Sequence, residues 1–309
     1  MNLEKQSVSV FAPATVSNVG PGFDVLGFAI DEMGDIITLS TTDDNEYTIE
    51  SLGAELPMQP EENVATVALK SFCDTIGYKG GFHIVIEKNF KPGSGLGSSA
   101  SSAVGAVFAA NQLLGSGYSK EALIVFALDG EFLASNNRHA DNIAPCMLGD
   151  FVVVKGCDPF DGFKIQSPDD LKVLIIFPDV PIKTAEARAM LPQQISMKDG
   201  IEQVANMAAL INGLYVSDYE MIKNSLHDRF AQPYRKQLIP FYDDVEKLVT
   251  SAGAYGFNIS GSGPTMFAFF KEEDDLGALK LSILKVYERK TIKVRFHESS
   301  INKRGVEVI

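Results

Sequence analysis

The stretch Lys91–Gly115, KPGSGLGSSASSAVGAVFAANQLLG, constrains the fold because a glycine-serine ribbon leads directly into an apolar stripe. Glycine lets the backbone adopt positive φ and approach a ligand closely. The residues from Ser98 to Leu114 have the pattern of a helix. The first turn of such a helix directs free N–H groups and the positive end of its dipole at the preceding loop. We therefore interpret residues 93–99 as a cradle for an anion such as phosphate.

Two simpler interpretations of this loop compete with the phosphate cradle: a flexible linker, or a plain helix cap made by Ser98 or Ser99. A linker would separate domains, whereas this segment lies between a predicted strand at 82–88 and a predicted helix. The established loops do not match, since no lysine follows the glycines as in a Walker A motif. The glycines are also too closely spaced for the dinucleotide fingerprint.

The composition is that of a globular protein with ample chain for a core. The 309 residues are 45% hydrophobic and 22% charged, which suggests one large domain or two ordinary ones. A formal net charge of −13 argues against general affinity for nucleic acid or an anionic membrane, because both require a cationic surface. The three cysteines lack C-x-x-C spacing, and the first 14 residues carry Glu4 and no sustained apolar run. We therefore predict a cytoplasmic protein with reduced thiols.

The predicted elements mix strands and helices in two halves. Strands are expected in VSVFAPA, DIITLSTT, the region of Glu50, 82–88 and 150–156, with helices at 98–114 and 120–135. A loop rich in Pro, Gly and Asp at 158–170 is the predicted boundary, which divides the chain into domains 1–167 and 168–309. In the second half, strands are expected in KVLIIFP, TMFAFF and IKVRFHE, and helices at 184–191, 199–215, 217–229, 241–252 and 274–288. The fold class predicted is α+β.

The glycine loop resembles the second motif of the kinase superfamily that includes galactokinases, homoserine kinases, mevalonate kinases and phosphomevalonate kinases. The core of that motif, G-L-G-S-S-A, is intact at 95–100, although Pro92 stands one residue nearer to it than in the family pattern. The resemblance implies that this loop wraps the phosphates of ATP. The residues it assigns to nucleotide binding in the loop are Pro92, Gly93, Ser94, Gly95, Leu96, Gly97, Ser98 and Ser99.

Three further segments resemble the same superfamily. Residues 258–265, NISGSGPT, resemble its third motif, a glycine-rich turn beside the phosphate loop, although the segment alone is equally consistent with a tight turn into a strand. Residues 12–24, APATVSNVGPGFD, resemble the first motif of homoserine kinases, with Thr15 where mevalonate kinases carry a lysine. Residues 139–145, HADNIAP, resemble another homoserine kinase segment. The resemblance spans most of the chain.

The resemblance implies a fold, an activity and a place for the site. The N-terminal half would adopt a domain like domain 2 of ribosomal protein S5, the C-terminal half a ferredoxin-like domain, and the site would lie between them. The implied reaction is ATP-dependent phosphorylation of L-homoserine in threonine biosynthesis, and a homodimer is expected from the family. Two alternatives are another small-molecule kinase of the superfamily, acting on an isoprenoid or sugar alcohol, and a catalytically silent relative that binds a metabolite.

Two acids in the predicted helix 120–135 are candidates for a metal site. Asp129 and Glu131 lie among apolar residues, so at least one carboxylate is expected to be buried and to need a partner. That partner is a metal, a nearby cation or a helix cap. The resemblance assigns Glu131 to Mg²⁺, together with the hydroxyl of Ser99, and phosphate or water oxygens would complete the coordination.

The resemblance also assigns residues to the amino acid and to the base of the nucleotide. Asn18 and Asp24 are expected near the α-ammonium, and Arg188 and Arg235 near the α-carboxylate, which suits the two parallel donors of a guanidinium. Without the resemblance, either arginine would be interpreted as a surface charge.

The reacting hydroxyl is expected to meet Asn142 and His139. An amide cannot accept a proton at neutral pH, so we predict transfer without a side-chain base, with Arg188 stabilising developing charge. A lone histidine such as His139 is more often a structural hydrogen-bonding group. Asn63 is expected to line the adenine pocket, although the local pattern is also that of an ordinary loop before a helix.

Overall fold

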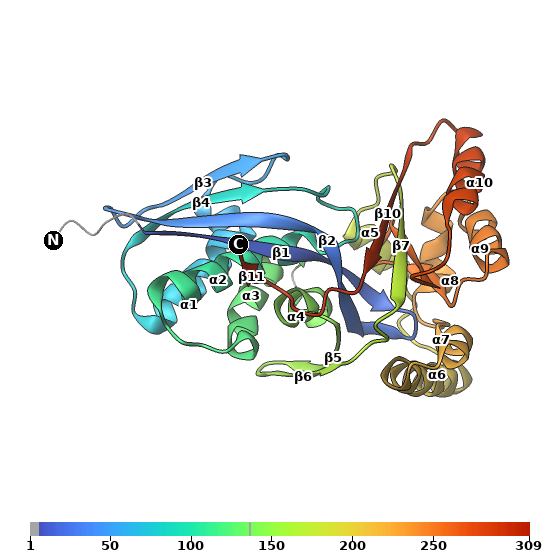
Figure 1. Ribbon diagram of the computed structural model, residues 1–309. Helices are drawn as coiled ribbons and strands as arrows, with labels where there is room; N and C mark the ends of the chain where they lie inside the picture. Colours follow the sequence, from blue (N-terminus) through green and yellow to red (C-terminus); the bar gives the residue numbers. More distant parts are fainter. Residues whose placement is uncertain (1–5, 136) are drawn as a thin grey trace.

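Two long antiparallel strands organise the first of two sheets in this computed structural model, which describes residues 6–135 and 137–309 (Figure 1). Strand β1 (Ser7–Val19) pairs with β2 (Gly22–Thr42) along nearly its whole length, through irregularities near Ala14 and Asn18. The first five residues, part of the segment predicted to lack a secretory signal, lie outside the described residues. Within residues 6–135 and 137–309, no helix is long and apolar enough to cross a membrane.

The seven-stranded first sheet has the order β11-β1-β2-β4-β3, and β5 joins β2 to β6. Strand β2 pairs with β4 through its later residues and with β5 through its earlier ones, so it serves two parts of the sheet. Strands β3 and β4 pair in parallel. The remaining strands are β3 (Tyr47–Leu52), β4 (Gly81–Glu87), β5 (Phe151–Cys157), β6 (Phe160–Ile165) and β11 (Glu307–Val308).

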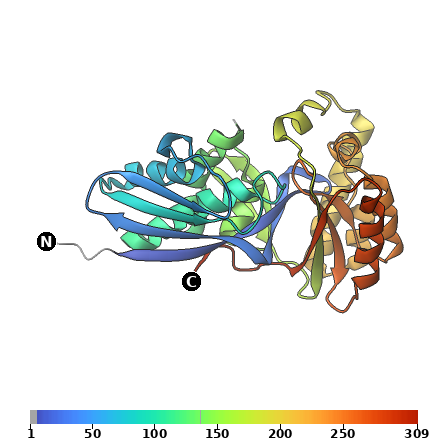
Figure 2. The same cartoon turned by 90° about the horizontal axis from the view of Figure 1, so that it is seen from above.

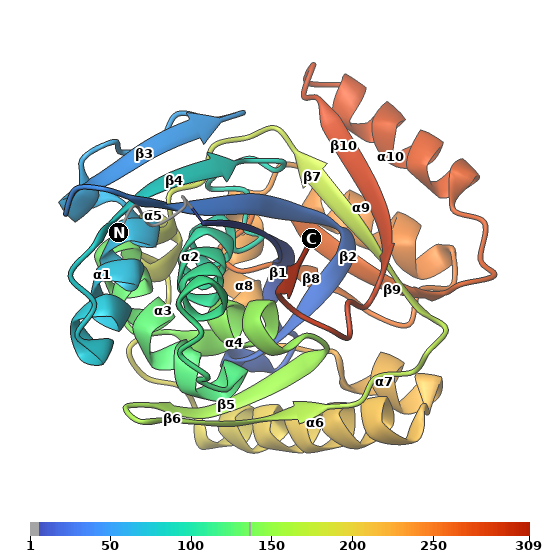
Figure 3. The ribbon, with the colours of Figure 1, turned by 60° about the vertical axis from the view of Figure 1, so that its left-hand side comes forward.

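Helix α2 (Ser98–Leu114) lies between the first sheet and three other helices (Figure 3). Every residue from Ala100 to Asn111 is buried, and most of these residues are alanine, serine or valine, which let neighbouring elements approach closely. A helix enclosed on all sides cannot carry charge cheaply, and this explains the uncharged stretch of the sequence. Its neighbours are α1 (Val64–Ile76), α3 (Lys120–Ser135) and α4 (Ala140–Leu148), with a 3₁₀ turn at Pro60–Glu62 before α1.

The second domain is a four-stranded sheet of order β10-β7-β9-β8 with helices around it. One face packs on α9 (Tyr242–Ser251) and α10 (Gly277–Glu288). The other face shares a core with the ends of β1 and β2, which reach toward it in Figure 2. In that shared core, Phe28 of β2 contacts Phe267 and Phe269 of β9 with ring centroids 5.7 and 5.5 Å apart. The α+β class is confirmed.

The bounds of this domain are as follows. The strands are β7 (Leu171–Pro178), β8 (Phe257–Ile259), β9 (Met266–Lys271) and β10 (Val294–Ser300). The helices are α5 (Thr184–Ala189), α6 (Met197–Val216), α7 (Tyr219–Ser225), α8 (Gln232–Arg235), α9 (Tyr242–Ser251) and α10 (Gly277–Glu288), with a 3₁₀ turn at Lys236–Leu238.

Several sequence-based expectations need correction. The predicted loop at 158–170 contains strand β6, which pairs with β5, because Phe160 and Ile165 can still pack although Pro, Gly and Asp surround them. The helix expected at 217–229 ends earlier, at Ser225. Beyond this end, the Asp228 carboxylate accepts hydrogen bonds from the backbone amides of residues 230–232, which form a separate turn. The domain boundary at 167 stays a prediction, and the tail from Ile301 to Val308 returns to the first sheet (Figure 1).

Candidate active site

Most of the residues singled out in the sequence line a cleft of ≈ 320 Å³ between the two domains. The glycine loop and α2 form one wall, the β1–β2 turn and α4 another, and residues after β7 and β8 the third. The predicted residues that line it are Asn18, Asp24, Asn63, Pro92, Gly93, Gly95, Gly97, Ser98, Ser99, Glu131, His139, Asn142, Arg188 and Arg235. Ser94 and Leu96 do not line the cleft and line a smaller cavity behind the loop instead, so the predicted contacts of their backbone with a nucleotide stay a prediction.

The glycine loop reaches α2 through backbone that favours glycine. Gly93, Gly95 and Gly97 have φ of 71°, 87° and 70°. Gly97 is the N-cap of α2, and no side chain caps the first turn. Free amides at a helix N-terminus, together with the helix dipole, make a site for an anion. The loop can therefore hold phosphate as the sequence predicted.

The third motif lies against this loop. The hydroxyl of Ser260 donates to the carbonyl oxygen of Gly95 at 2.5 Å, and that of Thr265 donates to the carbonyl oxygen of Ser94 at 2.6 Å. The amide of Gly261 donates to the carbonyl oxygen of Ser17 at 3.0 Å. The second domain thus fixes the shape of a loop that belongs to the first, in agreement with the expected neighbourhood of the two motifs.

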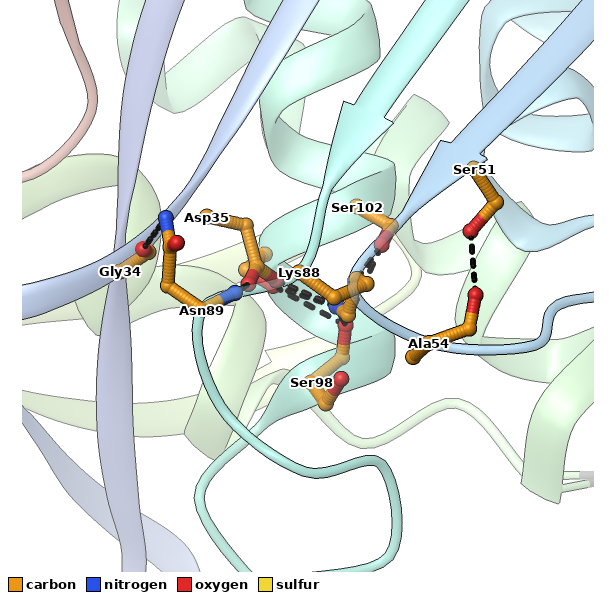
Figure 4. A network of polar contacts seen from close by, with 9 residues as sticks. Gly34, Asp35, Ser51, Ala54, Lys88, Asn89, Ser98 and Ser102 are labelled. Carbon is orange, nitrogen blue, oxygen red and sulfur yellow. Dashed lines mark hydrogen bonds and ion pairs between the residues drawn. The ribbon is translucent and has the colours of Figure 1, made fainter.

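A buried ion pair supports the first turn of α2 from behind (Figure 4). The Lys88 ammonium contacts the Asp35 carboxylate and donates to the Ser98 carbonyl oxygen at 2.8 Å and the Ser102 hydroxyl at 3.2 Å. Both charged side chains are at most 1% exposed. Burial lowers the pKa of Lys88, and the neighbouring Asp35 opposes that shift. Sequence reasoning missed this pair, because Asp35 and Lys88 are 53 residues apart.

Replacing Lys88 with methionine is expected to lower the free energy of unfolding by about 3–5 kcal/mol, because the Asp35 carboxylate stays buried without its cation. The double change Lys88→Met with Asp35→Asn should recover much of that loss, since no charge is left unpaired. It should still raise the KM for ATP, because the contact to Ser98 is gone. Urea unfolding and initial rates measure the two effects. A single variant as stable as the unmodified protein would contradict this account.

Opposite charges meet at the end of the cleft formed by the β1–β2 turn. The Arg188 guanidinium holds the Asp24 carboxylate with two contacts, 3.0 Å to Oδ1 and 2.8 Å to Oδ2. The Asn18 side-chain oxygen accepts from the Asp24 amide at 2.8 Å. The Phe23 ring stacks with both guanidinium groups, with the Cζ atoms of Arg188 and Arg235 at 5.3 and 5.1 Å from its centroid. The groups predicted for the two ends of an amino acid therefore pair with one another here.

Arg235 is only 3% exposed, so it is not the surface charge that its local sequence suggests. It donates to the carbonyl oxygen of Gly261 at 2.8 Å, and burial lowers its pKa. His139 lies nearby, with Nδ1 3.9 Å from the Asp24 carboxylate. Burial lowers the pKa of His139, and its buried Nε2 has no hydrogen-bond partner among the described residues.

Asn142 is fixed by two residues of β1. The Thr15 hydroxyl donates to its side-chain oxygen at 2.7 Å, and its nitrogen donates to the Ser17 hydroxyl at 3.0 Å. Thr15, at the position where mevalonate kinases carry lysine, therefore orients an amide. One N–H of Asn142 stays available to the cleft.

The two acids on α3 have different partners and different places in the structure. Asp129 accepts from the Ser71 hydroxyl at 2.5 Å and pairs with the Arg138 guanidinium. Glu131 lines the cleft, and its Oε2 accepts from the Ser99 hydroxyl at 2.9 Å. A carboxylate beside a hydroxyl fits Mg²⁺, which takes hard oxygen ligands. No group of three or more His, Cys, Asp or Glu suited to a metal occurs within residues 6–135 and 137–309, so other ligands would come from phosphate or water.

The end of the cleft at which adenine was expected is formed by the start of α1. The Asn63 side chain caps that helix by accepting from the Ala65 amide at 3.0 Å, and it donates to the Pro57 carbonyl oxygen at 2.8 Å. Its polar atoms thus connect the first turn of α1 to Pro57 in the wall of the cleft. Leu56, Pro57 and Val64 add apolar lining.

Asp141 is a cleft residue to which the sequence analysis gave no role. It is 3% exposed, on the first turn of α4 beside Asn142. Burial, together with the charges of Asp24 and Glu131, raises the pKa of Asp141 to about 7. Its position in the segment H-A-D-N was the one sequence feature that could have indicated a role for Asp141. The burial of its carboxylate depends on contacts with distant residues, which the sequence does not show.

Comparison with known proteins agrees with this geometry. Residues 63–150 match the model of the GHMP kinases N terminal domain, and residues 206–289 match that of the GHMP kinases C terminal domain. The chain belongs to the GHMP kinase family, and the resemblance inferred from its motifs is confirmed.

Within that family, several curated relatives are named homoserine kinase. The chain is 39% identical to "Homoserine kinase" of Chlorobium phaeobacteroides (strain BS1), over 98% of this chain and all of the relative. It is 38% identical to that of Pyrococcus abyssi, over 87% of this chain and 89% of the relative. A crystal structure of homoserine kinase from Cytophaga hutchinsonii covers 100% of this chain and 99% of its own, with 40% identity and a TM-score of 0.94.

Proposed function

We propose that the chain transfers the terminal phosphoryl group of ATP to the side-chain hydroxyl of L-homoserine, giving O-phospho-L-homoserine and ADP, in threonine biosynthesis. The observation that carries the proposal is the Asp24–Arg188 pair, held beside Arg235 in the same cleft as the glycine loop. The relatives named homoserine kinase support the substrate. A cytoplasmic location and a homodimer are further predictions.

An amino acid suits this pair because it carries both charges. A zwitterion can exchange partners with it, its ammonium meeting Asp24 while its carboxylate meets Arg188 and Arg235, so that no charge in the cleft loses its partner. The carboxylate of an isoprenoid acid could take Arg188, but the acid has no ammonium group and would leave Asp24 unpaired. A neutral sugar would leave the Asp24–Arg188 pair intact and would gain no charge contact from it. The alternative alcohols are therefore disfavoured by the charges of the site.

Phosphoryl transfer depends chiefly on positioning and electrostatic stabilisation. The loop amides and the N-terminus of α2 would hold the phosphates, and Ser99 and Glu131 would hold Mg²⁺. When bound, Mg²⁺ would neutralise phosphate charge. The free N–H of Asn142 would direct the acceptor hydroxyl, whose proton would pass to a phosphate oxygen or water, while Arg188 stabilises the developing charge.

Replacing Asn142 with alanine is expected to lower kcat about 100-fold, the usual effect of removing one donor that positions a reacting oxygen. Thr15→Val is the matched control, because it removes the hydroxyl that orients Asn142 and keeps the amide. We expect a smaller loss from it. Steady-state rates measure both variants. Asn142→Ala activity within a few-fold of the unmodified protein would remove Asn142 from the mechanism.

The kcat/KM for homoserine is expected to rise as pH increases through about 7, because Asp141 then ionises and favours a cationic ammonium nearby. Burial lowers the pKa of His139, so its ionisation is expected at lower pH than that of Asp141. Initial rates between pH 5.5 and 9 at saturating ATP give the profile. In Asp141→Asn the inflection near 7 should disappear, and a variant that keeps it would assign the titration elsewhere.

A coupled assay of ADP formation tests the function directly. With ATP and Mg²⁺, L-homoserine should sustain turnover, whereas mevalonate and galactose should not. Turnover of either of those without homoserine activity would establish the alternative kinase. Saturable homoserine binding without ATP consumption would establish a silent relative, although the described site retains the loop glycines, Ser99 and Glu131.

A further inference from the structure

A second, smaller cavity of ≈ 100 Å³ lies behind the phosphate loop, on the side away from the cleft. Its floor is apolar and comes from both domains, with Phe90 and Leu96 from the loop region and Ile175 from β7, all buried. Ser94, a loop residue that does not line the cleft, also lines this cavity.

Strand pairing arranges the opposite wall. Arg295 lies directly across from Phe177, and His297 across from Ile175, in the antiparallel register of β10 and β7. All four residues line the cavity. The Arg295 guanidinium lies over the Phe177 ring, with Cζ 5.2 Å from the centroid, which holds its planar donors at the mouth of the cavity.

Two polar groups at this cavity, the Arg295 guanidinium and the Ser94 hydroxyl, have no ion-pair or hydrogen-bond partner within residues 6–135 and 137–309, whereas other polar lining residues such as His297 do. No residue in the described part of the chain forms an ion pair with Arg295, and the nearby Asp179 already pairs with Lys91 at 2.7 Å. The Ser94 hydroxyl is buried and has no hydrogen-bond partner among the described residues. A buried polar group without a partner is costly, and a stacked guanidinium is suited to a carboxylate.

We propose that this cavity binds a small carboxylate with a short apolar chain. Its carboxylate pairs with Arg295, and its chain fills the space over Leu96 and Ile175. The site is distinct from the cleft, because none of its lining residues lines the cleft.

Binding there is coupled to the nucleotide through the loop. The Ser94 backbone is already held by Thr265 and by the Lys91 carbonyl oxygen, and a ligand packed against the Leu96 side chain adds a further restraint on the loop. A loop with three glycines of positive φ loses conformational freedom when it holds phosphate, so a ligand that orders it beforehand should tighten nucleotide binding.

Butanoate is the test ligand, and Met33, which lines the cavity, is the reporter. In protein labelled with ¹³C in the methionine methyl groups, and assigned with Met33→Leu, butanoate should shift the Met33 signal saturably. Butanamide should bind at least about 10-fold more weakly, since it lacks the charge. ADP should tighten butanoate, and butanoate should tighten ADP, by the same factor of at least about 5.

Arg295→Gln should weaken butanoate at least about 10-fold, whereas Arg289→Gln, an exposed arginine on another part of the domain, should leave it unchanged. An unmoved Met33 signal, or equal binding by Arg295→Gln, overturns the site. Binding without the reciprocal effect on ADP overturns the coupling. None of these measurements involves homoserine or turnover, so a wrong substrate assignment would not produce either result.

Discussion

Gly97→Ala is expected to reduce kcat/KM for ATP by about 100-fold or more, comparable to the loss of a preorganised donor in other active sites. A Cβ at position 97 would stand 2.1 Å from the Thr15 hydroxyl and 2.9 Å from the Asn142 side-chain oxygen. Both neighbours belong to the site, so relief of the clash must move the helix N-terminus or Asn142. Titration with nucleotide and initial rates measure the effect.

Gly115→Ala is the matched control for this change. Gly115 ends the same helix with φ of 60°, and a Cβ there meets nothing within 4 Å. Both alanines share the strain of positive φ, about 1–2 kcal/mol, so both should lower the free energy of unfolding. Only Gly97→Ala should lose nucleotide binding. Equal activity of the two variants would mean that the close approach at Gly97 does not matter.

Glu131→Gln is expected to lower kcat by about 100- to 1000-fold at saturating substrates, because a neutral amide is a poor ligand for Mg²⁺ where charge develops on phosphate. The substitution keeps the shape of the side chain and an oxygen that can accept from Ser99. Nucleotide should still bind through the loop amides. Rates measured against Mg²⁺ concentration should show a weaker apparent affinity for the metal.

Asp129→Asn provides the comparison, since Asp129 lies on the same helix and is engaged by Ser71 and Arg138 outside the cleft. Its activity should stay within about 3-fold of the unmodified protein, as expected for a partly exposed ion pair. If Asp129→Asn were inactive and Glu131→Gln active, the two acids would have been assigned the wrong way round.

Local patterns allowed the two central helices of the first domain to be predicted. The helix expected at 98–114 has those bounds in the structure, because its small residues, preceding glycines and terminal Gly115 are all near in sequence. Motifs joined by resemblance also met in one cleft, as expected from the family. Helix α3 likewise has the predicted bounds, 120–135.

Contacts between distant residues could not be predicted in this way. The 21 residues of β2 form one strand because two different partners pair with its two ends, and the sequence shows only the alternation of each part. Helix α4 includes Pro145 and lies in a segment interpreted from its motif alone. The Asp24–Arg188 pair joins residues 164 positions apart, so their mutual pairing was missed although each was expected at the substrate.

The return of the tail to the first sheet has a consequence for how the protein is made. Val306 is fully buried in the core of the first domain, and Asn302 is fully buried beside Asp31. A ribosome releases these residues after the entire second domain has been synthesised. The core of the first domain therefore stays incomplete until the tail has been synthesised. We expect the two domains to reach their final packing together rather than in the order of translation.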